Sequence, residues 1–390
     1  MNMGFFRRNI GKIIAVLFGV VFVGLVIFSG LVLTRNISVN NSEVTYKRQT
    51  EVLKFDVPSN GETAIGTLKH GVKFVNSGNT QRPIASMAKV ITALVVLNEK
   101  PLPNDEVFIV TARDVERYSR ETVRNGSRLH VVEGEEITER QAIEAIMLVS
   151  ANNIADSLVR WVFEDFDTYK VAAEKWLSDH GLENTTIGTD ASGFDASTTS
   201  TPSDMIEIGR LALQNEALRE IFLQQSAIFP FVGKENNTNQ LLTDGFIGIK
   251  TGNSDQALSC LLFAREYGDD IIIGVMMGQP FDSTFDSARK IWASVDQNFE
   301  KITIPANTIV GKYNLPWGGE VEVVTAEEIS SITWSDAQPE ISLEPISLDT
   351  NHKSNIGTLT IGDQITTLRI NNVLTGPSII WRLSNFNDFI

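Results

Sequence analysis

The pattern of apolar positions divides the chain into three parts. Residues 13–33 form an uninterrupted apolar run, relieved only by glycine and serine. At about 1.5 Å per helical residue, such a run is long enough to cross the hydrocarbon core of a membrane. Apolar residues then recur at helix and strand spacings, and after residue 300 the helical spacing disappears. We therefore predict a transmembrane helix (13–33), a mixed domain (51–300) and a small all-β domain (301–390).

The residues that flank the apolar run predict its orientation. Arg7, Arg8 and Lys12 precede it, and basic residues tend to remain on the cytoplasmic side of a membrane. Residues 1–12 are therefore expected in the cytoplasm, with the rest of the chain exported, as a single-pass protein of the cell membrane. A secreted protein released from a cleaved signal peptide is the alternative, although the run is long for one and no Ala-x-Ala site follows. The polar residues 34–50 are predicted to be a juxtamembrane linker.

Within the mixed domain, the predicted order is strands, several helices, two strands and a final helix. This order favours an α+β fold with an antiparallel sheet over alternating βαβ units. The stretch 101–137 is mixed and rich in turns, with no assigned helix. Predicted helices cover residues 138–150, 154–163, 168–180, 201–225 and 283–299, and predicted strands lie near residues 63–76, 258–264 and 271–277.

A serine and a lysine stand at the start of the most apolar helix. Residues 90–97 are apolar except for one threonine, which predicts a helix buried on all sides. Ser86 and Lys89 precede them, three positions apart and hence on one helical face. A desolvated lysine can take a proton from a serine hydroxyl, and a helix N-terminus suits an oxyanion. The spacing alone is weak, because Ser287 and Lys290 share it on a predicted amphipathic helix and are assigned no chemistry.

Two further motifs follow Ser86 in the chain. Ser150-Ala151-Asn152 falls between two predicted helices, and Lys250-Thr251-Gly252 lies at a strand before a hairpin. The other Ser-x-Asn triplets precede Ser86 and Lys-Thr-Gly occurs once, so a single ordered set can be drawn. Three motifs in order, each in a fitting local context, form a much stronger signal than any one of them.

With these motifs the sequence resembles the serine-type D-alanyl-D-alanine carboxypeptidases, low-molecular-mass penicillin-binding proteins with a β-lactamase/transpeptidase-like fold. The resemblance covers about residues 55–300, and the C-terminal β domain is similar in placement to one that these enzymes often carry. Two features depart from the family: Ala151 stands where Gly is frequent, and many relatives are anchored by a C-terminal amphipathic helix. The stretches that carry the resemblance are residues 83–89, 147–153, 190–195 and the glycine-rich approach to Lys250.

The resemblance implies a catalytic role for five residues. Ser86 would be the nucleophile that attacks the carbonyl between two D-alanines, and Lys89 the general base that takes its proton. Ser150 would relay a proton to the leaving amine, and Asn152 would hold the backbone amide of the substrate. Lys250 would supply positive charge near the scissile bond.

The resemblance also implies three substrate-binding residues on the third motif. Thr251 would contact the terminal carboxylate of the substrate, and Gly252 would let the peptide pair against a strand edge without a side chain in the way. The backbone N–H groups of Asn253 and Ser86 would form the oxyanion hole. Asp190, Ser192 and Asp195 are interpreted as structural loop residues.

Composition and the resemblance together define the expected partners. The chain has 48 acidic and 33 basic residues, a net charge of −15, which argues against nucleic acid because phosphate contacts need clustered Lys and Arg. Its four histidines show no metal-ligand spacing, so neither metal nor cofactor is predicted. Cys260, the sole cysteine, is expected to be a buried core residue. The resemblance implies a peptidoglycan stem peptide as substrate and β-lactams as covalent inhibitors.

Our hypothesis is a D-alanyl-D-alanine carboxypeptidase that removes the terminal D-Ala of stem pentapeptides through a serine acyl-enzyme. Three alternatives stay open. A DD-endopeptidase would use the same residues on crosslinks. A β-lactamase of the same fold would need a deacylating glutamate, and no matching motif is found in residues 164–200. A penicillin-binding sensor would be acylated without turnover.

Overall fold

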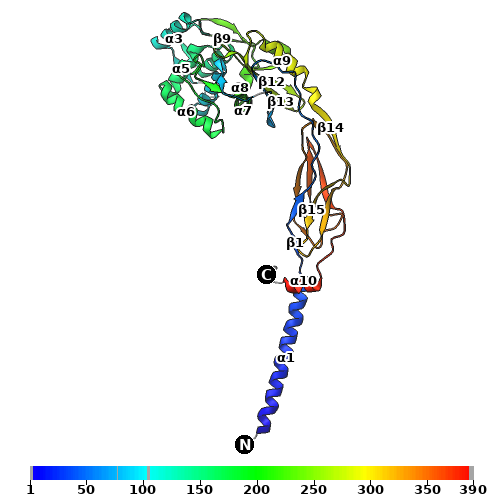
Figure 1. The fold of residues 1–390 in the computed structure, drawn as a ribbon. Coiled ribbons are helices and arrows are strands. Elements are labelled where there is room, and N and C mark those ends of the chain that lie inside the picture. The colour runs from blue at the N-terminus through cyan, green and yellow to red at the C-terminus, as the bar shows by residue number, and fades with distance from the viewer. Residues whose placement is uncertain (1–2, 77, 103–105, 386–390) are drawn as a thin grey trace. The chain divides into compact units, whose positions relative to one another are not determined.

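The computed structural model describes residues 3–76, 78–102 and 106–385, which form two compact units (Figure 1). The first unit is Phe55–Val295. The second combines the chain up to Lys54 with the chain from Asp296 onward. Residues 386–390 of the predicted 301–390 domain lie outside the described residues.

The first unit contains a five-stranded antiparallel sheet with helices packed against it (Figure 1). The sheet confirms the predicted α+β class and all three predicted strand regions. Strands β12 and β13 are buried along most of their length, which explains their nearly continuous apolar sequence. The strand order is β11 (Ile247–Ser254), β12 (Leu258–Tyr267), β13 (Asp270–Gln279), β3 (Glu62–Thr67) and β4 (Gly71–Val75).

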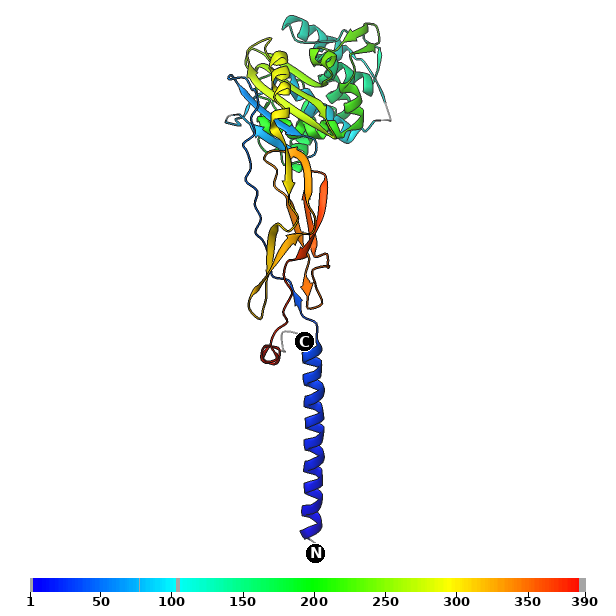
Figure 2. The same ribbon diagram turned by 90° about the vertical axis from the view of Figure 1, so that its right-hand side faces the viewer.

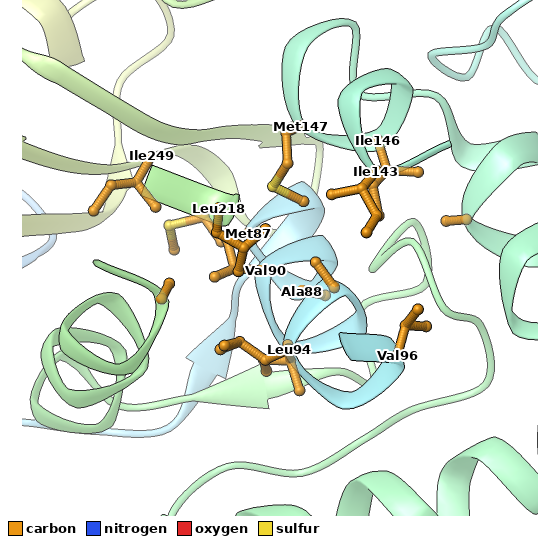
Figure 3. Packing of buried hydrophobic residues seen from close by; sticks show 14 of the residues in the cluster. Met87, Ala88, Val90, Leu94, Val96, Ile143, Ile146, Met147, Leu218 and Ile249 are labelled. Atoms are coloured by element: carbon orange, nitrogen blue, oxygen red, sulfur yellow. The ribbon is translucent and has the colours of Figure 1, made fainter. Parts of the chain in front are cut away.

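Helix α2 (Ala88–Glu99) is the centre of the hydrophobic core of this unit, as predicted. Its residues from Ala88 to Leu97 are buried on every face. Figure 3 shows side chains of neighbouring elements around it, among them Met147, Leu218 and Ile249. Removing that much apolar surface from water favours one fixed position for α2, at about 25 cal/mol per Å² buried. The start of α2 is therefore held rigidly.

The other helices agree with the predicted order but correct two boundaries. The predicted helix 201–225 is broken at Asn215, whose side chain accepts a hydrogen bond from the Leu218 N–H and caps a second helix. The predicted helix 283–299 ends at Ala293, and Phe299 begins a strand on which its ring packs against Trp334. The helices are α4 (Glu139–Leu148), α5 (Asn152–Phe163), α6 (Phe166–Asp179), α7 (Pro202–Gln214), α8 (Glu216–Phe222) and α9 (Thr284–Ala293).

Two of the described helices were not predicted: α3 in this unit, and the short helix α10 (Ile379–Ser384) in the region predicted to be all β. The stretch 101–137, interpreted as turns, contains α3 (Ala112–Val123). Thr111 and Asp114 form a capping box at its start. Three short strand pairs complete the unit: β5 (Arg82–Pro83) with β8 (Thr199–Ser200), β6 (Val107–Ile109) with β7 (Glu136–Thr138), and β9 (Ser226–Phe229) with β10 (Gly233–Asn236).

The second unit contains the β-rich C-terminal chain (Figure 2). A six-stranded sheet and two strand pairs enclose a core that includes Val310, Tyr313 and Leu359. A short helix, α10 (Ile379–Ser384), follows the last strand. The strands are β14 (Phe299–Ile304), β15 (Ile309–Asn314), β16 (Glu320–Thr325), β17 (Ile329–Trp334), β18 (Glu340–Leu343), β19 (Ile346–Ser347), β20 (Gly357–Ile361) and β21 (Gln364–Ile370).

The predicted linker 34–50 is corrected by the structure. Strand β1 (Ser38–Val39) pairs with β19, and β2 (Ser42–Val44) pairs with β15 at the edge of the six-stranded sheet. Val39 is 1% exposed, so its burial offsets the cost of ordering this polar stretch. The preceding helix α1 (Met3–Thr34) includes the predicted apolar run, and its segment Lys12–Thr34 is long and apolar enough to cross a membrane.

Candidate active site

Ser86 lies on the tight turn that leads into α2. Ala85–Met87 form a single 3-10 turn, and α2 begins at the next residue. Ala85 has a φ of 45°, in the left-handed region that non-glycine residues seldom adopt. Strained backbone of this kind is found preferentially at functional sites. The turn leaves Ser86 partly exposed while its neighbours Ala85 and Met87 are buried.

Lys89 lies one helical turn after Ser86, and its side chain is completely buried. Its Nζ lies 2.7 Å from the Ser86 Oγ and 3.0 Å from the carbonyl oxygen of Ser192. Burial removes the hydration of the ammonium and lowers the pKa of Lys89 to about 7. At neutral pH a large fraction of Lys89 is therefore uncharged and able to accept the proton of the Ser86 hydroxyl.

Four charged side chains modify this effect of burial. The carboxylates of Asp190, Glu121 and Asp156 raise the pKa of Lys89, and the guanidinium of Arg124 lowers it. Burial remains the largest cause, so the net shift is downward. The three acids favour the protonated form of Lys89. A general base needs this form, because it holds the proton between two steps.

The carbonyl that contacts Lys89 belongs to a loop organised by Asp190. The Asp190 carboxylate accepts hydrogen bonds from the N–H groups of Ser192 and Phe194, at 2.8 and 3.1 Å. Gly193 has a φ of 70°, and a Cβ there would collide with the carbonyl oxygen of Ala85. The loop thus packs directly against the turn that carries the nucleophile.

The third motif lies on β11, an edge strand of the sheet. Gly252 faces the turn before α2, because a Cβ there would lie 2.9 Å from the Ile84 carbonyl oxygen and 3.1 Å from the Ser86 nitrogen. Thr251 is half-buried and Asn253 is exposed. An edge strand offers N–H and C=O groups to which an extended peptide can bind.

Lys250 is almost completely buried on the same strand. Its Nζ donates a hydrogen bond to the carbonyl oxygen of Thr251 at 3.0 Å. Burial, and then the charge of Lys89, lower the pKa of Lys250 well below its usual value. The two amines are therefore within electrostatic reach of each other, which brings the first and third motifs together. Both effects disfavour the positive charge that the resemblance implies for Lys250.

The second motif lies where α4 ends and α5 begins. Ser150 has a φ of 61° and is 6% exposed, and Asn152 is the first residue of α5. The Asn152 Nδ2 donates a hydrogen bond to the Glu121 Oε2 at 2.9 Å. Within the described residues, no hydrogen bond joins this motif to Ser86. Its connection to Lys89 is through Glu121, whose charge acts on that lysine.

Glu121 was missed by the sequence analysis. It lies on α3, in the stretch interpreted as turns, and its side chain is completely buried. Besides Asn152, it binds Arg124 through both of its oxygens. The capping-box pattern of Thr111 and Asp114 is the sequence signal that could have revealed the helix. No sequence pattern links Glu121 to Asn152, because 31 positions separate them.

A groove of about 500 Å³ opens beside the second and third motifs. One of its walls includes Val149, the residue before Ser150. Another includes Thr238, whose hydroxyl lies 3.3 Å from that of Thr251. The groove therefore lies next to both motifs in the fold, although no motif residue lines it.

Metal chemistry has no candidate residues in the described ranges. No group of three or more His, Cys, Asp or Glu side chains there is placed to hold a metal ion. Cys260 is buried, as predicted, and burial raises the pKa of its thiol to about 11. Such a thiol stays protonated and packs as a core side chain.

Comparisons with known proteins agree on one family. A sequence model described as D-alanyl-D-alanine carboxypeptidase matches residues 72–280. A D-alanyl-D-alanine carboxypeptidase of Streptomyces sp. (strain K15) is 27% identical over 272 residues, covering 64% of this chain and 89% of that protein. The D-alanyl-D-alanine carboxypeptidase DacB2 of Mycobacterium tuberculosis is 29% identical over 205 residues, covering 51% of this chain and 67% of that protein.

Solved structures agree with the fold. A D-alanyl-D-alanine carboxypeptidase from Mycobacterium tuberculosis H37Rv is 26% identical with a TM-score of 0.56, covering 64% of this chain and 95% of that structure. The carboxypeptidase DacD from Francisella tularensis has a TM-score of 0.60 at 16% identity. That likeness covers 85% of this chain and 97% of that structure, and it concerns the fold alone.

Proposed function

We propose that this chain, which belongs to the D-alanyl-D-alanine carboxypeptidase family, carries out the reaction of that family at Ser86. The chain is a serine hydrolase with DD-carboxypeptidase function. Which residues perform the reaction is our proposal. It is carried by one observation, the 2.7 Å contact between the Ser86 hydroxyl and the amine of the fully buried Lys89.

In the first step, the Ser86 Oγ attacks the carbonyl carbon between the two D-alanines, and the Lys89 Nζ takes the hydroxyl proton. The carbonyl oxygen becomes an oxyanion, which we assign to the backbone N–H groups of Ser86 and Asn253. The 3.1 Å spacing between the Ser86 nitrogen and a Cβ built on Gly252 supports this assignment, because it brings β11 beside that nitrogen.

The tetrahedral intermediate then collapses. The C–N bond breaks, and the departing D-Ala amine receives a proton that Ser150 relays from Lys89. The shortened peptide is left as an ester on Ser86. Water then attacks the ester carbonyl while Lys89 takes a proton from it. The C–O bond to Ser86 breaks, the peptide leaves with a free carboxyl group, and Lys89 returns the proton to the Ser86 Oγ. Splitting the hydrolysis in this way replaces one difficult step by two easier ones.

Lys250 and Thr251 are proposed to bind the terminal carboxylate of the stem peptide. Burial, and then repulsion from the charge of Lys89, lower the pKa of Lys250 and so disfavour its positive charge. A carboxylate that enters the site reverses this effect, because an adjacent anion favours the charged form of an amine. Lys250 would then bind as a cation while Lys89 remains the base, and Asn152 would hold the backbone amide of the peptide.

The segment Lys12–Thr34 is proposed to anchor the chain in the cell membrane. Its length and composition, and the basic residues Arg7, Arg8 and Lys12 around its start, support a cytoplasmic N-terminus. A signal sequence satisfies the same criteria. N-terminal sequencing of the protein purified from membranes distinguishes them: an intact N-terminus supports the anchor, and a new N-terminus after the apolar run contradicts it.

The proposed reaction is tested with the full-length chain in detergent. Muropeptides with pentapeptide stems are incubated with the chain and examined by mass spectrometry, in parallel with labelling by a fluorescent penicillin. We expect loss of one terminal D-Ala and a penicillin adduct on Ser86, and neither with Ser86→Ala. Cleavage of crosslinked dimers instead would support an endopeptidase. A folded chain that neither labels nor releases D-Ala would contradict the proposal.

A further inference from the structure

We propose that Glu121 is a positioning residue of the active site, which fixes the orientation of the Asn152 carboxamide for the substrate. This role rests on the function proposed above for the Ser86 centre. Glu121 lies on α3, outside all three motifs, and its side chain is completely buried. A completely buried carboxylate is rare unless it is paired, because the loss of hydration is costly.

The hydrogen bond between Glu121 and Asn152 determines how the amide is turned. An ionised carboxylate only accepts hydrogen bonds, so the group that faces it at 2.9 Å must be the amide N–H and not the amide oxygen. Turning the amide over would bring two oxygens together. The Asn152 oxygen is therefore directed away from Glu121, and the amide has a second N–H besides the one that faces the carboxylate. Both groups are ones that a peptide backbone can pair with.

Arg124 and Gly126 hold Glu121 in place. The Arg124 Nε donates to the Glu121 Oε2 at 2.9 Å, and its guanidinium stacks on the Phe194 ring, 3.9 Å from the ring centroid. Phe194 belongs to the loop that binds the Lys89 amine. A Cβ on Gly126 would collide with the Glu121 carboxylate and lie 2.9 Å from the Asn152 Nδ2. The glycine thus leaves the room that this contact needs.

Glu121 also acts on the base. Lys89 is faced by the carboxylates of Asp190, Glu121 and Asp156, by the guanidinium of Arg124, and by the amine of Lys250. Removing the negative charge of Glu121 would make Lys89 release its proton at lower pH. A residue with only a structural role would leave that titration unchanged, so the pH dependence of acylation separates the two possibilities.

The test uses Glu121→Gln in the full-length chain, with Asp114→Asn as the matched control. Asp114 is also a buried acid on α3, and it binds Thr111, Ser157 and Arg160. The rate of acylation by a fluorescent penicillin is followed between about pH 5.5 and 9, together with the melting temperature. We expect Glu121→Gln to lower the maximal rate by about 10-fold to 100-fold and to shift the midpoint to lower pH. Asp114→Asn should lose thermal stability but keep the midpoint.

A double variant tests whether Glu121 acts through Asn152. If it does, Glu121→Ala in an Asn152→Ala background should cost little further rate, because the amide that it positions is already gone. The positioning role would be overturned if the rate losses of the two single variants multiplied in the double variant. It would also be overturned if Glu121→Gln had the rate and midpoint of wild type. Neither result would affect the proposed function. A wild-type chain that is not acylated would overturn the proposed function, and this role with it.

Discussion

The pairs Ser86–Lys89 and Ser287–Lys290 have the same spacing on helices of the same unit, but their surroundings differ. Lys89 is completely buried, and its amine lies 2.7 Å from the Ser86 hydroxyl. Lys290 is exposed on α9, a helix of which only one face is buried. No hydrogen bond joins Ser287 to Lys290 within the described residues. Spacing therefore makes the two residues of each pair neighbours, but it does not make them reactive.

The difference lies in what surrounds each amine. Lys89 is enclosed by the core around α2 and by the loop of Asp190. The charges of Glu121 and Asp156 act on its amine. Loss of hydration makes its neutral form accessible near pH 7. The amine of Lys290 stays in contact with water. If this contrast is correct, paired substitutions at the two sites should have very different effects.

The largest effect is expected from removing the nucleophile. Ser86→Ala should abolish penicillin labelling and D-Ala release, since no other hydroxyl among the described residues is hydrogen-bonded to the base, while Ser287→Ala should leave both unchanged. Both variants should melt within a few degrees of wild type, because neither serine is a large core side chain. Gel fluorescence and calorimetry check this. Residual labelling of Ser86→Ala at an identified second serine would break the comparison.

Removing the base should come next. Lys89→Met keeps the length and the apolar stem of the side chain, but it leaves the Ser86 hydroxyl without a proton acceptor. We expect acylation to slow by about 10²-fold to 10⁴-fold, the usual contribution of general base catalysis, while Lys290→Met reacts like wild type. Stopped-flow labelling measures both rates. Equal rates in the two variants would contradict the assignment of Lys89.

Lys250→Ala should have a smaller effect on the chemistry. It removes the cation proposed for the substrate carboxylate, and we expect acylation to fall by about 10-fold to 100-fold. The burial of Lys250 predicts some change in stability as well. The melting temperature and the acylation rate are compared on the same sample. A loss of acylation fully explained by unfolded protein would contradict its role.

The smallest effect concerns stability and pH. The pKa of Lys89 falls from 10.5 to about 7 on folding, so between these values the unfolded chain binds more protons than the folded chain. The free energy of unfolding therefore rises with pH in this window, by up to about 1.4 kcal/mol per pH unit from this lysine. Below about pH 7 this slope is absent, because both states bind the proton. Lys89→Met should lose this slope and Lys290→Met should keep it. Unfolding measured at about pH 7.5 and 9.5 checks the difference, and identical slopes in all three chains would contradict it.

Much of the fold follows from local patterns in the sequence. The all-round apolar residues 90–97 predicted a buried α2, the box of Thr138 and Gln141 predicted the start of α4, and the apolar runs predicted β12 and β13. Each of these patterns is complete within a dozen residues. For the same reason, the three motifs could be found without coordinates.

The missed features depend on distant contacts. Strands β1 and β2 are polar, and they are ordered only by pairing with β19 and β15, hundreds of positions later in the chain. Helix α3 was missed for another reason: six of its 12 residues are charged and few are apolar, so it shows little apolar periodicity. The contacts of Glu121 with Asn152 and of Lys89 with the Ser192 carbonyl join segments that no local period connects. The three motifs were therefore predictable, whereas the residues that hold them in place were not.

The most direct test of the account is the acylation rate of the wild-type chain as a function of pH. If burial makes Lys89 the base, the rate should rise with pH as this amine loses its proton, with a midpoint close to the pKa of about 7. Glu121→Gln should move this midpoint to lower pH. A rate that is flat from about pH 6 to 9, or a midpoint near that of a hydrated lysine, would contradict the claim that desolvation activates this site.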